Sequence, residues 1–398
     1  MRIWHLASEF PPATVTGLGR MVDGLARAQA TAGDDVIVFS SHFDQAPPDQ
    51  LRPDGVRVIR IADPIPHAEP AVDLGVTLFA LGAVTEILRR RDSLPAPDII
   101  NLHDWYPVPA GWVLQRHFRC AQVLTLHDTA LGKARENSNG ELTNSARFIA
   151  KVEHSGGRQA GHVICGSRHM VEELTGAYGF SPQDVTAIPC GIDTHHLPEV
   201  PATRVAEVRG RYAEGDGAVV LFVGRFVPEK GIDLIIAAAD TVLARARDSR
   251  FVIAGAGPLE EALRQDVTRR GLQHAFHFPG FLQDEELSAH YRMADLLVMP
   301  SRYEPFGQVC LEGMCHALPV VVPDATALSE FVDHGTHGLQ FTSGDSGALA
   351  NAIVRLACNP ELRRQLGDNG RRLATTRFRW SEVAARTKSA YMQAMDSR

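Results

Sequence analysis

Short β-rich runs alternate with amphipathic segments along this chain, and this alternation limits the fold more than any other feature of the sequence. Residues 2–8 and 35–40 are predicted strands, and residues 19–33 between them place apolar side chains at helical spacing. A strand, helix, strand unit is typical of a mostly parallel sheet covered by helices on both faces. Further predicted strands of the first half lie at 56–61, 99–102, 122–126, 162–165 and 185–188.

The same alternation restarts in the second half of the chain. Residues 194–216 carry no strong period and contain Pro198 and Pro201, so we interpret them as a linker. The sequence therefore predicts an α/β chain of two facing Rossmann-like, doubly wound domains with a cleft between them. The predicted strands of the second half lie at 218–223, 250–253, 275–278, 296–299 and 320–322, and the predicted helices at 231–246, 259–271, 285–293 and 309–317.

We place the first domain at residues 1–197 and the second at residues 198–375. Residues 359–397 have the pattern of terminal helices, and we expect the C-terminal helix at 376–398 to pack back on the first domain. With 398 residues, 44% of them hydrophobic, the chain is long enough to build two hydrophobic cores.

Composition argues against several classes of function. The net charge is −7 and the basic residues are scattered, which leaves no basic patch for a nucleic acid. No apolar run approaches the ~20 residues that span a bilayer, and the first residues lack the apolar core of a signal peptide, so we expect a cytoplasmic protein with no strong membrane signal. The six cysteines form no C-x-x-C pair and are interpreted as buried or half-buried thiols. Assembly into a homo-oligomer is left open.

The loop at residues 301–312 carries the strongest signal for a site. Ligands of open α/β sheets bind outside the carboxyl ends of the strands, and this loop follows a predicted strand. Glu304 and Glu312 can accept hydrogen bonds from sugar or ribose hydroxyls, and Gly307 allows close backbone approach at a helix N-terminus suited to phosphate. The alternative is that both glutamates are surface acids favoured near a helix start by the macrodipole.

Two more loops of the second half follow predicted strands. The loop at 223–231 places Arg225 and Lys230 where a diphosphate would lie, although either cation alone could be a solvated surface charge. The loop at 254–259 is rich in glycine, but it is not a full G-x-G-x-x-G and is weak evidence for NAD. The chain contains no Asp-x-Asp, so Arg225 and Lys230 remain as the charge neutralisers and no metal ligands are predicted.

Polar residues also follow predicted strands of the first half. Gly17 precedes a helix and could admit a phosphate or a sugar close to the backbone. His103-Asp104 and His127-Asp128 each stand at the carboxyl end of a strand. A single histidine is more often a structural residue, but two such pairs at one sheet edge favour a role in the site.

These loops, in this order, resemble the family 4 glycosyltransferases. That family has the GT-B fold and includes bacterial sugar transferases and relatives of sucrose-phosphate and glycogen synthases. The sequence departs from the common pattern at Gly17-Leu18-Gly19, where many members have adjacent glycines, and at Cys190, where an asparagine is common. The resemblance spans nearly the whole chain and is carried by residues 16–20, 123–127, 188–193, 224–231 and above all 304–312.

The resemblance implies a retaining glycosyltransferase whose second domain holds a nucleotide-sugar. Arg225 and Lys230 would bind the donor diphosphate, while Glu312 would bind the ribose and Glu304 the transferred sugar. His127 would lie beside the reacting sugar, so the catalytic set would be His127, Glu304, Arg225 and Lys230. The remaining donor contacts implied are Gly17, Leu282 near the base, and the backbone of Phe306, Gly307, Gln308 and Val309.

Acceptor contacts are expected from the first domain. We assign His103, Asp104 and Lys133 to the acceptor side, with Arg135 as a further cation that could meet an anionic acceptor. The predicted reaction moves a hexosyl group from a UDP- or GDP-sugar to a hydroxyl of a small soluble acceptor, with no permanently bound cofactor and no metal. Three alternatives are a glucosyl transfer like that of glycogen or sucrose-phosphate synthases, a two-lobed sugar-binding protein without catalysis, and an NAD-dependent oxidoreductase.

Overall fold

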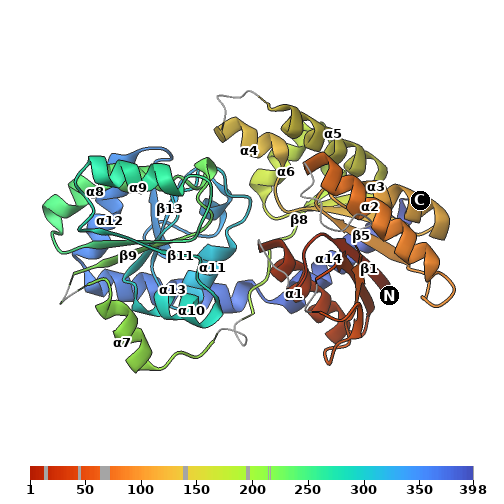
Figure 1. Cartoon of the computed structure of the whole chain (residues 1–398), viewed down its shortest axis with the longest axis horizontal. Coiled ribbons are helices and arrows are strands. Elements are labelled where there is room, and N and C mark those ends of the chain that lie inside the picture. The colour runs from red at the N-terminus through yellow and green to blue at the C-terminus, as the bar shows by residue number, and fades with distance from the viewer. Residues whose placement is uncertain are drawn as a thin grey trace. The chain divides into compact units, whose positions relative to one another are not determined.

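The structure is a computed structural model, and it divides into two compact units (Figure 1). Unit 1 comprises Met1–Gly191 and Arg379–Arg398, and unit 2 comprises Ile192–Phe378. The structure describes residues 1–12, 17–43, 46–62, 72–137, 142–193, 198–213, 215 and 217–397, and it describes side chains throughout these ranges except at 72–76 and 136–137. Thr16 of the stretch at 16–20 and part of the segment at 194–216 therefore lie outside the described residues.

Unit 1 is built on an eight-stranded sheet in the order β3-β4-β2-β1-β5-β6-β7-β8. Every strand pair is parallel except that of β3 with β4 at one edge. The strands are β1 (Arg2–Ala7), β2 (Asp35–Ser41), β3 (Asp49–Leu51), β4 (Arg57–Ile61), β5 (Ile99–His103), β6 (Ala121–Leu126), β7 (His162–Cys165) and β8 (Val185–Ala187). The helices are α1 (Gly17–Thr31), α2 (Val72–Arg89), α3 (Val108–Phe118), α4 (Ala130–Asn137), α5 (Asn144–Gln159), α6 (Arg168–Ala177) and α14 (Trp380–Asp396), with a 3-10 turn η1 (Pro182–Asp184).

Strand β1 shows why the sheet of unit 1 is covered on both faces. Trp4 and Leu6 belong to one core, whereas Ile3 and Ala7 pack on the opposite face. Because side chains alternate along a strand, His5 shares the face of Ile3, which is the face covered by α1 and α14. A side chain at the centre of this sheet is therefore buried whichever way it points.

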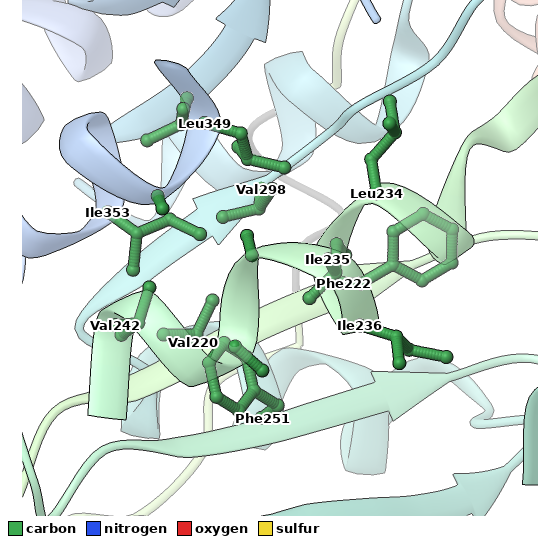
Figure 2. Close-up of a cluster of buried hydrophobic side chains, with 14 of the residues drawn as sticks. Val220, Phe222, Leu234, Ile235, Ile236, Val242, Phe251, Val298, Leu349 and Ile353 are labelled. Atoms are coloured by element: carbon green, nitrogen blue, oxygen red, sulfur yellow. The ribbon is translucent and has the colours of Figure 1, made fainter. Parts of the chain in front are cut away.

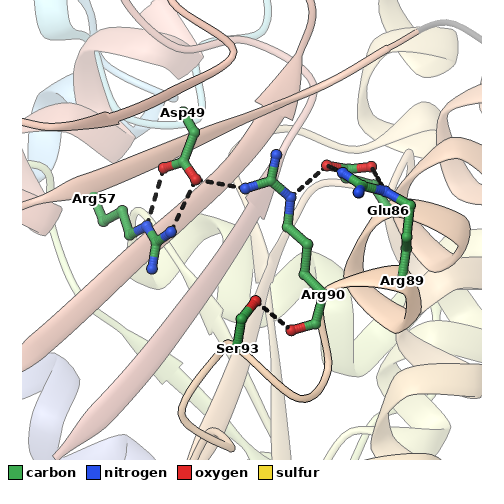
Figure 3. Close-up of polar contacts among 6 residues, drawn as sticks. All are labelled: Asp49, Arg57, Glu86, Arg89, Arg90 and Ser93. Atoms are coloured by element: carbon green, nitrogen blue, oxygen red, sulfur yellow. Dashed lines mark hydrogen bonds and ion pairs between the residues drawn. The ribbon is translucent and has the colours of Figure 1, made fainter.

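Polar contacts tie the antiparallel edge of the sheet to helix α2 (Figure 3). Both oxygens of Asp49 on β3 accept hydrogen bonds from Arg57 on β4, at 3.0 and 2.8 Å. Arg90, just beyond α2, donates to Asp49 and to Glu86. The hydrogen bond from Arg57 is the main reason that the pKa of Asp49 is lowered. This cluster stabilises a short edge strand that has little apolar surface to bury.

Unit 2 is built on a six-stranded parallel sheet in the order β11-β10-β9-β12-β13-β14. Its strands are β9 (Val219–Val223), β10 (Arg250–Ala254), β11 (Phe276–Gly280), β12 (Leu296–Val298), β13 (Val320–Pro323) and β14 (Gly338–Phe341). Its helices are α7 (Ala202–Gly210), α8 (Ile232–Arg245), α9 (Glu260–Arg269), α10 (Asp284–Met293), α11 (Gln308–Cys315), α12 (Ser346–Ala357) and α13 (Pro360–Arg377), with 3-10 turns η3 (Pro228–Lys230) and η4 (Ala327–Glu330).

The main core of unit 2 lies between the sheet and helices α8 and α12 (Figure 2). Ile235 and Val242 of α8 and Ile353 of α12 pack over Val220 and Val298 of the sheet. Branched aliphatic side chains on central parallel strands produce the continuous apolar runs from which the sheet was predicted. The predicted fold class, α/β with two Rossmann-like domains, is confirmed.

The linker interpretation of residues 194–216 needs a correction. Within that segment the structure forms helix α7, in which Val208 is buried and Arg209 donates to the backbone of Met293. The helix gains its stability from packing on α10 rather than from an amphipathic pattern of its own, which is why the sequence showed no strong period.

Candidate active site

Two strand-to-helix loops meet at the carboxyl end of the sheet in unit 2. The loop after β9 runs through Arg225 and η3 to Gly231, and the loop after β12 begins at Met299. Gly231 has φ 66°, and a Cβ at this position would collide with the carbonyl of Pro300. The backbone N–H of Arg302 donates to the carbonyl of Glu229 at 2.8 Å. The backbone therefore holds the two loops side by side.

Lys230 and Glu304 form an ion pair across these loops. Nζ of Lys230 donates to Oε2 of Glu304 at 2.7 Å, and Oγ of Ser301 donates to the same oxygen at 3.2 Å. The Lys230 side chain is 21% exposed and that of Glu304 is 9% exposed, so the contact is largely shielded from water. The structure thus brings together two residues that the resemblance implied in donor binding.

Arg225 lies on the same loop and extends toward solvent. Its side chain is 51% exposed, and its guanidinium lies 3.9 Å from the carboxylate of Glu229. The N–H groups of Gly224 and Phe226 donate to the carbonyls of Ala254 and Ala256 at 3.0 and 2.9 Å. The backbone of Arg225 is therefore fixed while its charge stays accessible to a ligand.

The glycine-rich loop after β10 supports that backbone. A Cβ at Gly255 would collide with the carbonyl of Gly224, and a Cβ at Gly257 would collide with the backbone of Phe226. Both glycines also have positive φ, 136° and 159°. Close approach of two backbones explains these glycines, so the loop provides no support for an NAD site.

Helix α11 begins directly after the ion pair. Gly307 caps the helix with φ 101°, and a Cβ there would collide with Leu328. Gln308 and Val309 occupy the first turn, where backbone N–H groups have no partner within the helix and suit an anion. Phe306 is buried against Phe331, with ring centroids 5.7 Å apart, so its side chain is structural.

Glu312 lies one turn further along α11 and is held by a residue that the sequence analysis missed. The hydroxyl of Tyr291 on α10 donates to Oε2 of Glu312 at 2.9 Å. The ring of His316 stacks on the ring of Tyr291, with centroids 5.1 Å apart. The hydroxyl oxygen of Ser288 lies 3.0 Å from Nε2 of His316. The buried Tyr291 thus orients the carboxylate that the resemblance implied in ribose binding.

Leu282 follows β11, the edge strand of the same sheet. It is half-buried beside Phe281, which is 64% exposed. No hydrogen bond or ion pair is described between Leu282 and the loops that carry Lys230 and Glu312. Its assignment near a nucleotide base stays a prediction.

In unit 1, the structure joins the two predicted histidines. Nδ1 of His103 lies 3.0 Å from Nε2 of His127, and Nε2 of His103 lies 2.9 Å from Nδ1 of His5 on β1. His103 is 1% exposed and uses both ring nitrogens within unit 1, so it supports His127 and has no ring atom left for an acceptor. His5 was not singled out from the sequence.

Asp104 fixes the backbone at the same place. Its Oδ1 accepts the backbone N–H of His127 at 2.7 Å, and its own φ of 60° turns the chain sharply after β5. Burial, together with the charge of Asp128, raises the pKa of Asp104 well above its ordinary value. The structure therefore places Asp104 as a support for His127 rather than as a free acceptor-side group.

Burial lowers the pKa of all three histidines. Desolvation brings the pKa of His127 to about 4 and that of His5 to about 4, and it holds the pKa of His103 well below its ordinary value. Desolvation is the dominant cause because the charged imidazolium loses more than the neutral ring when water is removed. The three rings are therefore neutral near pH 7.

The remaining predicted residues of unit 1 lie around helices α4 and α1. Lys133 pairs with Asp128 at 2.6 Å, and both side chains are about one-third exposed. Arg135 is exposed on α4, and Gly17 is the exposed first residue of α1. Thr16, in the stretch that carried the resemblance, lies outside the described residues.

The described part of the chain shows neither a membrane-spanning helix nor a cluster of metal ligands. No helix within it is both long enough and apolar enough to cross a bilayer. Among the same residues, no group of three or more His, Cys, Asp or Glu side chains is arranged to hold a metal ion.

Comparisons with known proteins agree with this geometry. A family described as "Glycosyl transferases group 1" matches residues 206–373, and one described as "Glycosyltransferase Family 4" matches residues 15–196. The glycogen synthase of Mycobacterium tuberculosis is 30% identical over 405 residues, covering 99% of this chain and 95% of that protein. This chain belongs to the group 1, family 4 glycosyltransferases.

Two further similarities confirm the fold of this glycosyltransferase. A D-inositol 3-phosphate glycosyltransferase of Acidothermus cellulolyticus is 29% identical, covering 96% of this chain and 86% of that protein. The solved structure of a sucrose-phosphate synthase from Thermosynechococcus elongatus covers 100% of both chains with a TM-score of 0.84 at 25% identity. The glycosyltransferase thus has the GT-B fold and belongs to a retaining family that uses nucleotide-sugar donors.

Proposed function

We propose that this glycosyltransferase moves a hexosyl group from a UDP- or GDP-sugar to a hydroxyl of a small soluble acceptor, such as a sugar, a cyclitol or a secondary metabolite. The observation that carries the proposal is the pair of Lys230 and Glu304, 2.7 Å apart and largely shielded from water. An ammonium and a carboxylate at this spacing match the two halves of a sugar diphosphate, since the cation suits the phosphates and the carboxylate suits the sugar hydroxyls.

Donor binding would exchange partners within this pair. A bound diphosphate would give Lys230 a second anionic partner. It would also contact Arg225, whose side chain is half-exposed in the structure. Glu304 is then released to accept hydrogen bonds from sugar hydroxyls, with Ser301 still donating to it. Both cations also stabilise negative charge that grows on the leaving phosphate, which is where electrostatic catalysis is most effective.

Retention fits a front-face reaction in which the leaving phosphate takes the proton of the acceptor hydroxyl. Such a reaction needs no protein base with a pKa near 7. The neutral His127 is consistent with this, because its lowered pKa makes it a weak base that is suited to hydrogen bonding with the reacting sugar.

The class of acceptor is inferred from the two sequence relatives reported above. One is named for a polymer, glycogen, and the other for a small phosphorylated cyclitol, inositol 3-phosphate. Lys133 and the exposed Arg135 on α4 of unit 1 would suit a small anionic acceptor. Glucosyl transfer onto a glucan is the second candidate, favoured by the 30% identity to a glycogen synthase.

The test is a nucleotide-release assay with UDP-, GDP- and ADP-linked hexoses, each with inositol phosphate, hexose phosphates, free cyclitols or maltooligosaccharides as acceptor. We expect acceptor-dependent release with a UDP- or GDP-sugar, and an α-linked product from an α-linked donor by proton NMR. Glu304→Gln is the inactive control. Release only with ADP-glucose and maltooligosaccharides would replace the proposal by the glucan reaction, and no product with any pair would contradict both.

The positive charges expected at the donor diphosphate predict how the rate of transfer responds to the removal of metal ions. Because Arg225 and Lys230 supply two positive charges on one loop, we expect transfer to continue in excess EDTA at more than half of its untreated rate. The measurement compares initial rates after dialysis against EDTA with and without added Mg²⁺ or Mn²⁺. Complete loss that either metal restores would show that the cations do not suffice.

A further inference from the structure

Two neighbouring aromatic side chains hold Glu312 at its carboxylate and at its backbone. The hydroxyl of Tyr291 on α10 lies 2.9 Å from Oε2 of Glu312. Nδ1 of His316, just beyond α11, lies 2.8 Å from the backbone carbonyl of Glu312. The rings of Tyr291 and His316 stack on each other with an interplanar angle of 25°. Tyr291, His316 and Glu312 therefore form a closed set in which each residue contacts the other two.

The acceptors determine the direction of both hydrogen bonds. A carboxylate oxygen and a backbone carbonyl oxygen carry no proton, so the Tyr291 hydroxyl and Nδ1 of His316 are the donors. Burial lowers the pKa of His316, which keeps its ring neutral near pH 7. A neutral imidazole still carries the one proton that this contact needs. Both contacts are therefore formed at pH 7.

Tyr291 orders the carboxylate before a ligand arrives. The Tyr291 side chain is buried on α10, whereas Glu312 is half-buried and lies on the helix that begins at the donor loop. Ordering a flexible side chain during binding weakens a ligand by about two- to twelvefold. Because Tyr291 and His316 already hold Glu312 in the free protein, a ligand that uses this carboxylate does not bear that cost.

The positioned carboxylate suits two adjacent hydroxyls. A carboxylate has about four acceptor positions on its two oxygens, and the Tyr291 hydroxyl uses one of them. Glu312 can therefore accept from the 2′- and 3′-hydroxyls of a ribose while Tyr291 still donates to it. A nucleotide without these hydroxyls would leave the positioned carboxylate partly dehydrated and without new partners, and polar sites reject such analogues for this reason.

We infer that Tyr291 and His316 are positioning residues that hold the Glu312 carboxylate for the two ribose hydroxyls, and that they thereby make the donor site select ribonucleotides over nucleotides without these hydroxyls. The contact between Glu312 and the donor rests on the proposed function. Helix α10 thus contributes to nucleotide selection without touching the ribose.

The test measures by calorimetry how tightly the full-length protein binds UDP, GDP and ADP and their 2′,3′-dideoxy forms. We expect the wild type to bind the preferred ribonucleotide at least about tenfold more tightly than its dideoxy form. Tyr291→Phe should weaken the ribonucleotide by about two- to twelvefold and change the dideoxy form by less than about twofold. His316→Leu should reduce the preference in the same direction, and it provides the test if Tyr291→Phe does not fold.

Two controls separate positioning from a general loss of structure. Tyr212→Phe is the matched variant, because the Tyr212 hydroxyl also contacts α10, at 2.9 Å from Nε2 of His290, and should leave the preference unchanged. In a Glu312→Ala background, Tyr291→Phe should have no further effect on ribonucleotide affinity, since the carboxylate that it positions is absent. In the transferase reaction, Tyr291→Phe should raise the donor KM and leave kcat unchanged, because the ribose contact is the same in ground and transition states.

Four results would overturn the inference: equal affinity of the wild type for both forms, equal weakening of both forms by Tyr291→Phe, the same change in Tyr212→Phe, or an effect of Tyr291→Phe that persists in Glu312→Ala. Binding of ADP alone with the preference intact would support the inference and contradict only the proposed donor. Binding of no nucleotide by the wild type would contradict the proposed function itself.

Discussion

Two carboxylates of unit 2, one on the loop before α11 and one on α11 itself, have different neighbours. Glu304 contacts a cation and a serine hydroxyl, whereas Glu312 accepts from the buried hydroxyl of Tyr291. A group that balances a cation can change partners when a diphosphate arrives, but a group held by a buried phenol keeps its orientation. These environments fit Glu304 for a contact that changes during the reaction and Glu312 for one that stays constant.

Substitutions at the two glutamates should therefore have different effects. Glu312→Ala should weaken free nucleotide by about 1.5–3 kcal/mol, because a charged hydrogen bond to the ribose is lost in ground and transition states alike. Glu304→Gln should mainly lower kcat, because the Glu304 carboxylate contacts the transferred sugar ring, which gains positive character in the transition state. Calorimetry with free UDP or GDP and turnover measurements would separate the two. Loss of nucleotide binding in Glu304→Gln alone would show that the two roles are reversed.

The buried Glu153 of unit 1 predicts a dependence of stability on pH. Desolvation raises its pKa from 4.5 to about 7, although Tyr178 and the Ala130 N–H donate to it. A carboxyl whose folded pKa is raised contributes stability that is fully present below about pH 4.5 and is lost as pH rises through 7, by about 3 kcal/mol in total. Glu153 therefore contributes a loss of stability in unit 1 between about pH 4.5 and pH 7, whereas the buried histidines, whose pKa is lowered, contribute a gain as pH rises toward 6.5.

Glu153→Gln should remove only the contribution of Glu153, so that the variant gains stability relative to the wild type as pH rises from about 4.5 to 7, because a neutral amide keeps the acceptor oxygen without the buried charge. All four tryptophans, Trp4, Trp105, Trp112 and Trp380, lie in unit 1, so denaturation followed by tryptophan fluorescence reports on this unit. Glu172→Gln, on an exposed position of α6, is the control and should keep the wild-type slope. If stability changed with pH equally in Glu153→Gln and in the wild type, Glu153 would not contribute to that dependence.

At the scale of elements, the loops after β9 and β10 act as one structure. The glycines of the second loop allow the backbone of the first to approach, and the first carries Arg225. The glycines of the loop after β10 do not have the full spacing of a dinucleotide-binding fingerprint. They instead fit the close approach of the neighbouring loop. Single-sequence patterns could not show this, since the relation depends on β9 and β10 being adjacent in the sheet.

Gly255→Ala should consequently harm both stability and donor binding. A methyl group at this backbone conformation collides with the Gly224 carbonyl, so we expect a loss of about 2–4 kcal/mol in unit 2 and at least tenfold weaker nucleotide binding. Gly210→Ala is the control, because a Cβ at the end of α7 meets open space. Thermal unfolding and calorimetry would test this, and a neutral Gly255→Ala would show that the two loops are not coupled.

Strand-to-helix alternation predicted the fold well, and the loops that follow strands predicted Lys230, Glu304 and His127. Supporting residues were missed because their partners are distant in sequence: Tyr291 reaches Glu312 from another helix, and His5 reaches His103 only because β1 lies beside β5. Strand β14 and helix α12 were also missed. Strand order is a property of packing, and spacing along one chain does not encode it.

At the scale of the whole molecule, the chain ends by completing the unit with which it began. Helix α14 buries Tyr391 and Ala394 against the sheet of unit 1, and the Trp380 ring occupies the space that a side chain at Gly24 or Gly191 would need. Arg386 also donates to the carbonyl of Ala187. Unit 1 therefore lacks part of its core until helix α14 has been made.

Ending the chain after Phe378 should therefore destabilise unit 1 selectively. Removing α14 exposes Ile3, Val123 and Ile164 and leaves Asn101 without the Tyr391 hydroxyl, so we expect loss of most of the ~5–15 kcal/mol typical of a domain. Tryptophan fluorescence should show an unfolded or strongly weakened unit 1, while hydrogen exchange in β9 and β12 stays slow. Removal of only the last two residues is the control. Addition of a peptide of residues 379–398 should restore part of the stability, because α14 carries its contacts within one helix. Loss of protection in both units together would show that the two units fold as one cooperative body.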